Sequence, residues 1–243
     1  DGSFDYTPNS GYAGTDSFTY HATDGMKDSN IATVNITVNG PNHTPTAVAD
    51  AYNTDEDTLL TVLLPGVLLN DTDDENDPLT AVLDSDVTNG TLNLSADGSF
   101  TYLPDLNYTG TDSFTYHAND GVTSSNIVTV SIDVDPVNDA PEAFDDNYIT
   151  DEDLPINISA PGVLNNDFDV DLDPITAILV DDVSNGTLTL NADGSFDYTP
   201  TSGYSGSDSF TYKASDGTFD SSTVTVTITI NPAPNTAPAA VHT

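Results

Sequence analysis

The fold is decided by residues 110–118, Gly-Thr-Asp-Ser-Phe-Thr-Tyr-His-Ala, and by the residues just before them. In this stretch Phe114, Tyr116 and Ala118 alternate with polar residues. A period of two places the apolar side chains on one face of a β-strand. Upstream, apolar residues flank the dipeptide Asp97-Gly98, which is a typical β-hairpin turn. The sequence therefore predicts a hairpin followed by a half-buried strand.

The same stretch occurs three times, beginning at Gly14, Gly110 and Gly206, and 110 − 14 = 206 − 110 = 96 residues. A repeat of that length is the size of a domain, so we expect each copy to have its own core. The register predicts that residues 1–41 are the C-terminal half of a truncated repeat. Residues 42–137 and 138–234 are predicted to be complete repeats, and residues 235–243 to start the next one.

The rest of the repeat is also predicted to be strand. Apolar residues alternate or cluster in ranges 47–54, 59–63, 79–83 and 127–134, and turn residues separate them. Together with the hairpin and the strand after it, this gives about seven short strands per repeat. We therefore predict an all-β fold of tandem Greek-key, Ig-like or cadherin-like β-sandwiches. Phe100, Tyr102, Phe114, Tyr116 and their copies should fill the cores.

The charge of the chain excludes several partners. Two Lys and no Arg stand against 40 acidic residues, for a net charge of −38. Nucleic acid is excluded because binding it needs clustered cations. Without an apolar run of about 18 residues, direct membrane insertion is not expected. There is no Cys, which excludes a disulfide, a thiolate metal site and a Cys nucleophile.

Two acidic loops are candidate metal sites. Residues 71–77 read Asp-Thr-Asp-Asp-Glu-Asn-Asp, and their copy at 167–173 reads Asp-Phe-Asp-Val-Asp-Leu-Asp. Two carboxylates about 6 Å apart repel by roughly 3 kcal/mol at an effective dielectric near 20. Ca²⁺ relieves such repulsion because it takes six to eight oxygen ligands in flexible geometry. The loops are thus predicted to bind Ca²⁺, and the alternative is a solvated acidic loop. Asp97 and Asp193 are interpreted as hairpin-turn residues.

The chain resembles a known family in its repeat ends. Ala118-Asn119-Asp120-Gly121, an alternating strand, and then Val137-Asn138-Asp139-Ala140-Pro141 are similar to the end of a cadherin repeat. The whole pattern resembles the tandem cadherin-like and bacterial Ig-like repeats of large bacterial adhesins. The linker Asn42-His43-Thr44-Pro45 departs from that pattern because it lacks the acid. The resemblance implies a secreted or cell-surface bacterial protein whose neighbouring repeats share Ca²⁺ ions.

The resemblance also implies ligands at three junctions between repeats. At the first junction they are Asp16, Asn42, Asp71, Asp73, Asp77 and Asp120. At the second they are Glu56, Asp112, Asn138, Asp139, Asp167, Asp169, Asp173 and Asp216. At the third, Glu152 and Asp208 meet the linker that begins at Asn235.

The sequence favours a non-catalytic function. His21 and His117 share a repeat position that Lys213 occupies in the third copy, and no Ser-His-Asp set, His-rich site or nucleotide loop can be drawn. The leading hypothesis is a structural or adhesive array that Ca²⁺ stiffens into a stalk or filament. The alternatives are a module that binds polysaccharide or another cell surface, and a subunit that self-assembles into extracellular fibres.

Overall fold

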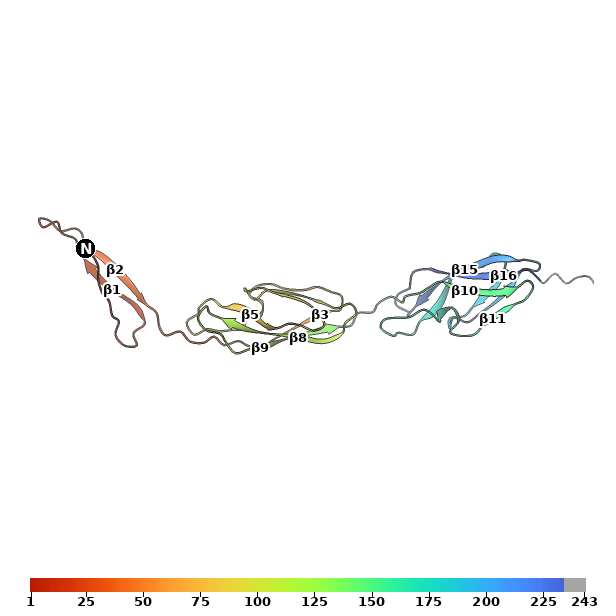
Figure 1. Ribbon diagram of the computed structural model, residues 1–243, viewed down its shortest axis with the longest axis horizontal. Helices are drawn as coiled ribbons and strands as arrows, with labels where there is room; N and C mark the ends of the chain where they lie inside the picture. Colours follow the sequence, from red (N-terminus) through yellow and green to blue (C-terminus); the bar gives the residue numbers. More distant parts are fainter. Residues whose placement is uncertain (234–243) are drawn as a thin grey trace, which may run out of the picture. The chain divides into compact units, whose positions relative to one another are not determined.

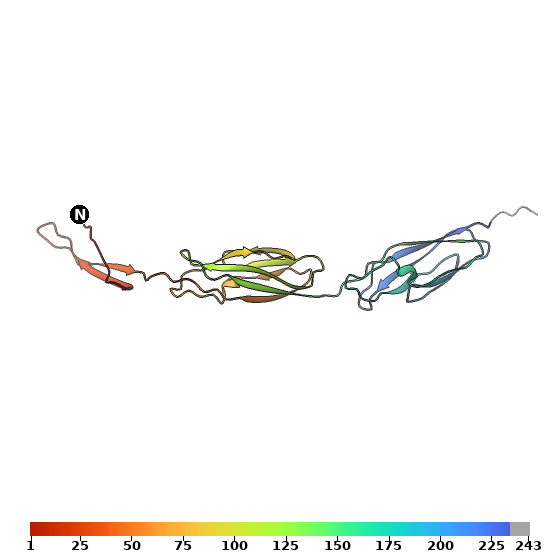
Figure 2. The same cartoon turned by 60° about the horizontal axis from the view of Figure 1, so that its bottom comes forward.

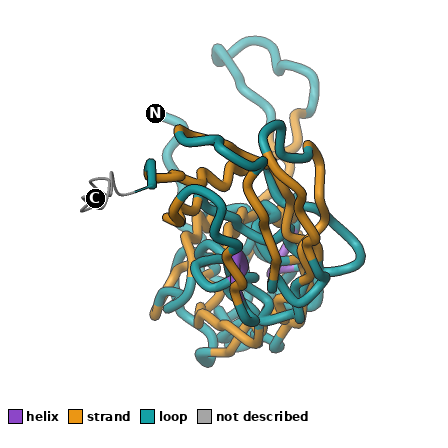
Figure 3. Tube along the Cα trace, turned by 90° about the vertical axis from the view of Figure 1, so that its right-hand side faces the viewer, coloured by secondary structure: helices purple, strands orange, loops and turns teal. Residues whose placement is uncertain are grey.

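The computed structural model describes residues 1–233 and is almost entirely β-structure (Figure 1). Helical backbone in the described residues is confined to two short 3₁₀ turns, η1 (Gly66–Leu68) and η2 (Gly162–Leu164), drawn in purple in Figure 3. The chain divides after Pro136 into two compact units. The all-β prediction is confirmed. The predicted start of a further repeat, 235–243, lies outside the described residues.

The first complete repeat contains the seven predicted strands. They are β3 (Asp50–Asp55), β4 (Leu60–Val62), β5 (Thr80–Ser85), β6 (Gly90–Leu94), β7 (Phe100–Pro104), β8 (Gly110–Asn119) and β9 (Val128–Asp135). One sheet has the order β3-β9-β8-β5 and the other β4-β7-β6. The pair β3 and β9 is parallel, and the other pairs are antiparallel. The repeat is therefore a sandwich of a four-stranded and a three-stranded sheet.

The second complete repeat has the same architecture, which Figure 2 shows from another side. Its strands are β10 (Asp146–Asp151), β11 (Ile156–Ile158), β12 (Thr176–Asp181), β13 (Gly186–Leu190), β14 (Phe196–Pro200), β15 (Gly206–Ser215) and β16 (Val224–Asn231). The sheet orders β10-β16-β15-β12 and β11-β14-β13 match those of the first repeat.

The N-terminal residues form one antiparallel pair, β1 (Gly14–Tyr20) with β2 (Ala32–Val38). These strands stand 96 residues before β8 and β9 (110 − 14 = 128 − 32 = 96). Tyr20 is 52% exposed, whereas its copy Tyr116 is fully buried. The pair thus leaves at the surface one ring that is core in the complete repeats.

Aromatic rings form the centre of each sandwich. Phe100, Tyr102, Phe114 and Tyr116 are at most 2% exposed, and so are their copies Phe196, Tyr198, Phe210 and Tyr212. Tyr52, Phe100 and Phe114 form a series of edge-to-face contacts with centroid distances of 5.1 and 5.5 Å. Burial of such large rings dominates the stability of a small sandwich. The predicted core is confirmed.

Each repeat has an entry end and an exit end, fixed by its own strands. At the entry end the chain forms a bridge to the acidic loop, Thr46 with Thr72 in the first repeat and Glu142 with Phe168 in the second. At the exit end the Glu56 amide donates to the Asp135 carbonyl, where β3 and β9 both finish. The acidic loop and the buried glutamate are therefore at opposite ends of one repeat.

Candidate metal-binding site

The entry end of the second repeat gathers six polar residues that we call the second entry cluster: Asn138, Asp139, Asp169, Asp171, Asp173 and Asp216. The Asn138 amide nitrogen donates to Asp216 Oδ2 at 2.8 Å. The Asp139 backbone N–H donates to Asp171 Oδ2, also at 2.8 Å. Asp169 Oδ1 accepts the N–H groups of Asp171 and Asp173 at 2.9 and 3.3 Å. The linker, the acidic loop and the β15–β16 turn thus meet at one place.

The first repeat has an equivalent first entry cluster: Asn42, His43, Asp73, Glu75, Asp77 and Asp120. Here the Asn42 amide nitrogen donates to Asp120 Oδ2 at 2.9 Å, and the His43 N–H to Glu75 Oε2 at 3.0 Å. His43 replaces Asp139, and its ring contacts the Glu75 carboxylate. The hydrogen bond with Glu75, and then the charge of that carboxylate, raise the pKa of His43. A protonated His43 supplies one internal positive charge that the second cluster lacks.

In both clusters the aspartate at one shared repeat position has a side-chain oxygen that is buried without a donor among the described residues. These atoms are Asp73 Oδ2 and Asp169 Oδ2, which occupy the same repeat position. Asp169 as a whole is 5% exposed. A buried carboxylate oxygen without a hydrogen bond carries a desolvation penalty of several kcal/mol, of order 3. A hard cation is the partner that such an oxygen, surrounded by other carboxylates, would accept.

The aspartates of the β8–β9 and β15–β16 turns are held in their ionised form. Asp120 Oδ1 accepts the N–H groups of Thr123 and Val122, at 2.6 and 2.7 Å. The Thr123 N–H and then the Asn42 amide lower the pKa of Asp120 well below its usual value. In the copy, the Asn138 amide and then the Phe219 N–H lower the pKa of Asp216. Both carboxylates therefore keep the charge that cation binding requires.

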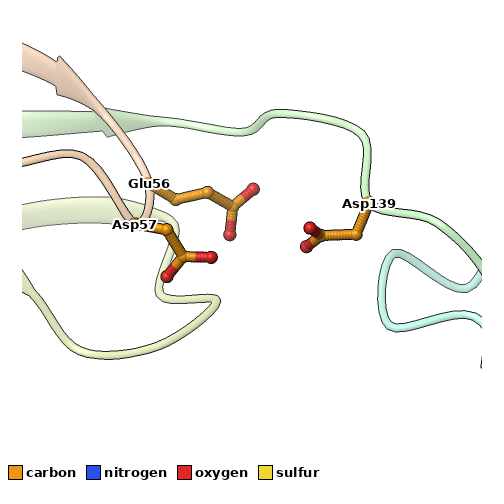
Figure 4. A group of neighbouring side chains, drawn as sticks. All are labelled: Glu56, Asp57 and Asp139. Atoms are coloured by element: carbon orange, nitrogen blue, oxygen red, sulfur yellow. The ribbon is translucent and has the colours of Figure 1, made fainter.

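The exit end of the first repeat offers two carboxylates (Figure 4). Glu56 is 4% exposed, and one of its oxygens lies within 4.8 Å of an oxygen of Asp57. The figure also draws Asp139, which stands four residues after the last residue of β9, Asp135 (139 − 135 = 4). Asp57 was not among the predicted ligands, although the triplet Asp-Glu-Asp, which occurs at residues 55–57 and again at 151–153, could have indicated it.

Glu152 is the copy of Glu56 at the exit end of the second repeat. Its Oε2 accepts the N–H of Ala233 at 3.0 Å, and its own N–H donates to the Asn231 carbonyl. It therefore lies where the chain leaves β16. The linker at Asn235, which it was predicted to meet, is outside the described residues.

Asp71 and Asp167, two predicted ligands, face the core. The Tyr116 hydroxyl lies 3.0 Å from Asp71 Oδ2, 2.6 Å from the Val67 carbonyl and 3.4 Å from Asp50 Oδ2. Tyr212 makes the same contacts with Asp167, Val163 and Asp146. Since a hydroxyl has one proton, it cannot donate to all three acceptors at once. Burial, and then the charge of Asp71, raise the pKa of Asp50 to about 6.

A pH dependence follows from these aspartates. Burial raises the pKa of Asp146 to about 6 as well. A raised folded-state pKa means that stability is present below the unfolded value near 4 and is lost as pH rises through about 6. In chelator, the double variant Asp50→Asn, Asp146→Asn should therefore gain about 1 kcal/mol on the wild type between pH 4 and 7, after allowance for partial solvent exposure.

Urea unfolding at several pH values measures this difference. Asp97→Asn is the control, because hydrogen bonds from the Ser99 hydroxyl and N–H lower the pKa of Asp97, and its difference should have the opposite sign. Parallel pH profiles for the wild type and the double variant would contradict the prediction.

Asp112 and Asp208, also predicted ligands, have a full set of protein donors. Asp112 accepts the N–H groups of Thr88, Asn89 and Ser113 at 2.8–3.1 Å and the Tyr102 hydroxyl at 3.0 Å. Burial raises the pKa of Asp112, but these hydrogen bonds outweigh it and the net pKa is lowered. The geometry explains both residues as structural acceptors, and their metal role stays a prediction.

Asp112→Asn should therefore destabilise the first repeat by about 2 kcal/mol, because an amide NH₂ would face donors that need an acceptor. The loss should be equal in Ca²⁺ and in chelator, as calorimetry can measure. A loss that appears in Ca²⁺ alone would instead assign Asp112 to a metal site. Ser113→Ala, which keeps the backbone N–H, is the control.

Asp16 lies on β1, and its Oδ2 accepts the Tyr6 hydroxyl at 2.9 Å. This is the contact that Tyr102 makes with Asp112 in the complete repeat. The metal role of Asp16 likewise stays a prediction.

Known protein families match most of the chain. The sequence profile of the bacterial cadherin-like domain matches residues 42–136 and 138–232, and that of the bacterial Ig domain matches residues 1–37. No curated protein matches the chain. The described residues contain no helix long and apolar enough to cross a membrane.

Several solved structures are similar to this chain, and the first of them shows the fold. Human mucin-like protocadherin EC1-2 is 17% identical over 78% of this chain and 98% of its own, with a TM-score of 0.50. Drosophila N-cadherin EC1-4 is 14% identical over 86% of this chain and 53% of its own, with a TM-score of 0.47. An endo-fucoidan hydrolase of glycoside hydrolase family 107 is 20% identical, with a TM-score of 0.36; the match covers 94% of this chain but only 35% of the hydrolase.

The two matches of the bacterial cadherin-like profile together cover most of the chain. Each falls on a sandwich with seven strands and an acidic entry cluster. The chain therefore belongs to the family of bacterial cadherin-like domains.

Proposed function

We propose that this chain is part of a non-catalytic extracellular array, structural or adhesive, whose entry clusters bind Ca²⁺ and so restrict motion between successive repeats. The observation that carries the proposal is the pair of buried, donor-free oxygens, Asp73 Oδ2 and Asp169 Oδ2. Their recurrence at the same position in two repeats argues against an accident of one loop.

The donor set fits Ca²⁺. The second entry cluster offers carboxylates of Asp139, Asp169, Asp171, Asp173 and Asp216 and an amide of Asn138. Ca²⁺ prefers carboxylate and carbonyl oxygens and tolerates irregular geometry, whereas Mg²⁺ demands near-octahedral geometry and keeps its waters. A bound ion would neutralise these charges and supply the missing partner of Asp169 Oδ2.

Stiffening would require ligands from both repeats. Glu56 and Asp57 stand at the exit end of the first repeat, where β9 finishes, and Asn138 follows β9 by three residues (138 − 135 = 3). An ion shared in this way would remove the relative motion that domains on a short linker otherwise have.

Isothermal titration with Ca²⁺ tests binding, and small-angle scattering tests stiffening. We expect saturable binding with a Kd of about 10⁻⁴–10⁻³ M, the range of extracellular modules. Asp169→Asn should weaken one site, whereas Asp193→Asn, which removes the same charge from a hairpin turn, should not. The distribution of interatomic distances should narrow in Ca²⁺ and broaden in chelator. Absence of binding would overturn the proposal, and binding without a change in scattering would remove the stiffening.

A further inference from the structure

The acidic loop of the second repeat carries apolar residues that its copy lacks. Phe168, Val170 and Leu172 stand where the first repeat has Thr72, Asp74 and Asn76, each 96 residues earlier. Facing the loop, Phe144 stands where the first repeat has Val48. We call Phe144, Phe168, Val170 and Leu172 the apolar patch.

The patch is exposed. Phe144 is 42%, Phe168 50%, Val170 40% and Leu172 88% exposed. The two phenyl rings lie against each other, with centroids 6.3 Å apart and planes inclined by 25°. Exposed apolar residues are ordinary when scattered singly, but a group of four on one loop and its neighbour marks an interaction surface.

Local structure does not explain these residues, because both loops have the same backbone. Asn76 donates its N–H to the Asp73 carbonyl, and Leu172 donates its own to the Asp169 carbonyl, both at 3.2 Å. Asn76 has a φ of 58° and Leu172 a φ of 64°. Asn tolerates this left-handed conformation, whereas Leu is strained in it. Leu172 therefore costs free energy twice, through its left-handed backbone and through its exposed apolar side chain. A contact with a partner outside the repeat would offset these costs.

The surroundings of the patch are negative. Glu142 and Asp145, which lie outside the second entry cluster, are exposed beside the apolar residues in sequence. Among the described residues of the second repeat the one Lys or Arg is Lys213, which pairs with Asp220 at 3.6 Å. A partner must therefore supply apolar groups for the rings and positive charge for the rim.

From this charge complementarity we propose that the apolar patch of the second repeat docks a cationic amphipathic segment of another protein, with apolar side chains against Phe144, Phe168, Val170 and Leu172 and Lys or Arg against the acidic rim. The rim consists of Glu142 and Asp145, so the inference does not require the proposed Ca²⁺ site, and binding is measured in chelator. The first repeat, acidic but without the patch, would bind only the charge of such a segment.

The first repeat supplies a matched variant. Phe144→Val, Phe168→Thr, Val170→Asp, Leu172→Asn together give the second loop the residues of the first, which already adopt this backbone. The probes are a synthetic amphipathic peptide of Leu and Lys and a peptide of equal charge made of Ser and Lys. Binding to the whole chain is measured by fluorescence anisotropy at about 150 mM salt, where exposed charges are screened beyond about 8 Å.

Apolar docking and purely electrostatic attraction predict different changes in peptide affinity for the four-residue variant. Loss of four partly buried apolar contacts should weaken binding of the Leu/Lys peptide by about tenfold or more. The Ser/Lys peptide should bind the variant equally or more tightly, because Val170→Asp adds a negative charge. If both peptides bind the variant as tightly as the wild type, the attraction is purely electrostatic and the docking site is wrong.

The reverse graft keeps the test decisive if the first variant folds poorly. Val48→Phe, Thr72→Phe, Asp74→Val, Asn76→Leu should create a second site for the Leu/Lys peptide and double the stoichiometry. An unchanged stoichiometry would overturn the proposal. So would a neutral polysaccharide that binds the wild type and not the four-residue variant, while the Leu/Lys peptide binds both alike.

Discussion

Addition of Ca²⁺ should raise the melting temperature of this chain strongly. A ligand that binds only the folded state contributes RT ln(1 + [L]/Kd). At about 10 mM Ca²⁺ and a Kd of about 10⁻⁴–10⁻³ M this is roughly 1.4–2.7 kcal/mol per site. For a domain of this size each kcal/mol shifts the melting temperature by about 4–8 °C, so one site gives about 6–20 °C. Differential scanning calorimetry in Ca²⁺ and in chelator measures the shift.

Asp169→Asn should act with opposite signs in the two conditions. In chelator it removes a buried, donor-free charge and should leave the second repeat equally or more stable. In Ca²⁺ it removes a ligand and should reduce the shift. Asp193→Asn controls for the loss of one charge, and Mg²⁺ should have a much smaller effect than Ca²⁺. An unchanged transition in Ca²⁺ would mean that both acidic loops are merely solvated.

The two repeats should also respond unequally. His43 stands in the first entry cluster where Asp139 stands in the second, and it pairs with Glu75. When protonated, it neutralises one carboxylate and repels a cation. The Ca²⁺-induced shift should therefore be smaller for the first repeat below the raised pKa of His43, and His43→Asp should enlarge it.

The strands and core were predictable because their signals are local or repeated. Phe114 and Tyr116 alternate with polar residues, and the strand period alone places both on one face. Three copies with a common spacing then predicted the extent of a repeat without any knowledge of its contacts. Asp97 was predicted as a turn residue, and its carboxylate indeed accepts the Ser99 N–H at 3.0 Å.

The side-chain chemistry of the site was less predictable, because its contacts join distant residues. Asp50 and Tyr116 are 66 residues apart, and no local pattern marks their contact. Asp112 entered the predicted ligand set through resemblance, yet the Thr88 and Asn89 amides that surround it come from a loop 23–24 residues upstream. Repetition identified such positions as constrained, but a carboxylate that holds a loop and one that holds an ion look alike in sequence.

The stretch Pro-Gly-Val-Leu occurs at residues 65–68 and again at 161–164, and this recurrence alone does not show its cause. In the structure it forms the η1 and η2 turns. Val67 is fully buried there, its N–H donates to the Gly98 carbonyl at 3.0 Å, and its carbonyl accepts the Tyr116 hydroxyl. The motif therefore joins the hairpin turn at Asp97-Gly98 to the core and to the acidic loop.

Gly66→Ala should consequently be among the most damaging single substitutions in the first repeat. Gly66 has a φ of +56°, and a Cβ there would lie 1.9 Å from the Gly98 carbonyl oxygen. The obstacle is backbone and cannot rotate away, so the hairpin or η1 must shift. Left-handed strain of about 1–2 kcal/mol adds to an overpacking cost of about 1–3 kcal/mol, and we expect a loss of about 2–5 kcal/mol. Gly162→Ala should do the same in the second repeat, where the distance is 2.0 Å.

Gly121→Ala separates the two contributions, because Gly121 has a φ of +93° but nothing within 4 Å of a Cβ. It should lose only the strain, about 1–2 kcal/mol. Calorimetry of Gly66→Ala should show one transition lowered by about 8–40 °C and the other in place, since each sandwich has its own core. Equal losses for Gly66→Ala and Gly121→Ala would show that the close approach of Gly66 to Gly98 is not what fixes the turn. A joint shift of both transitions would show that the two sandwiches, despite separate cores, unfold as one unit.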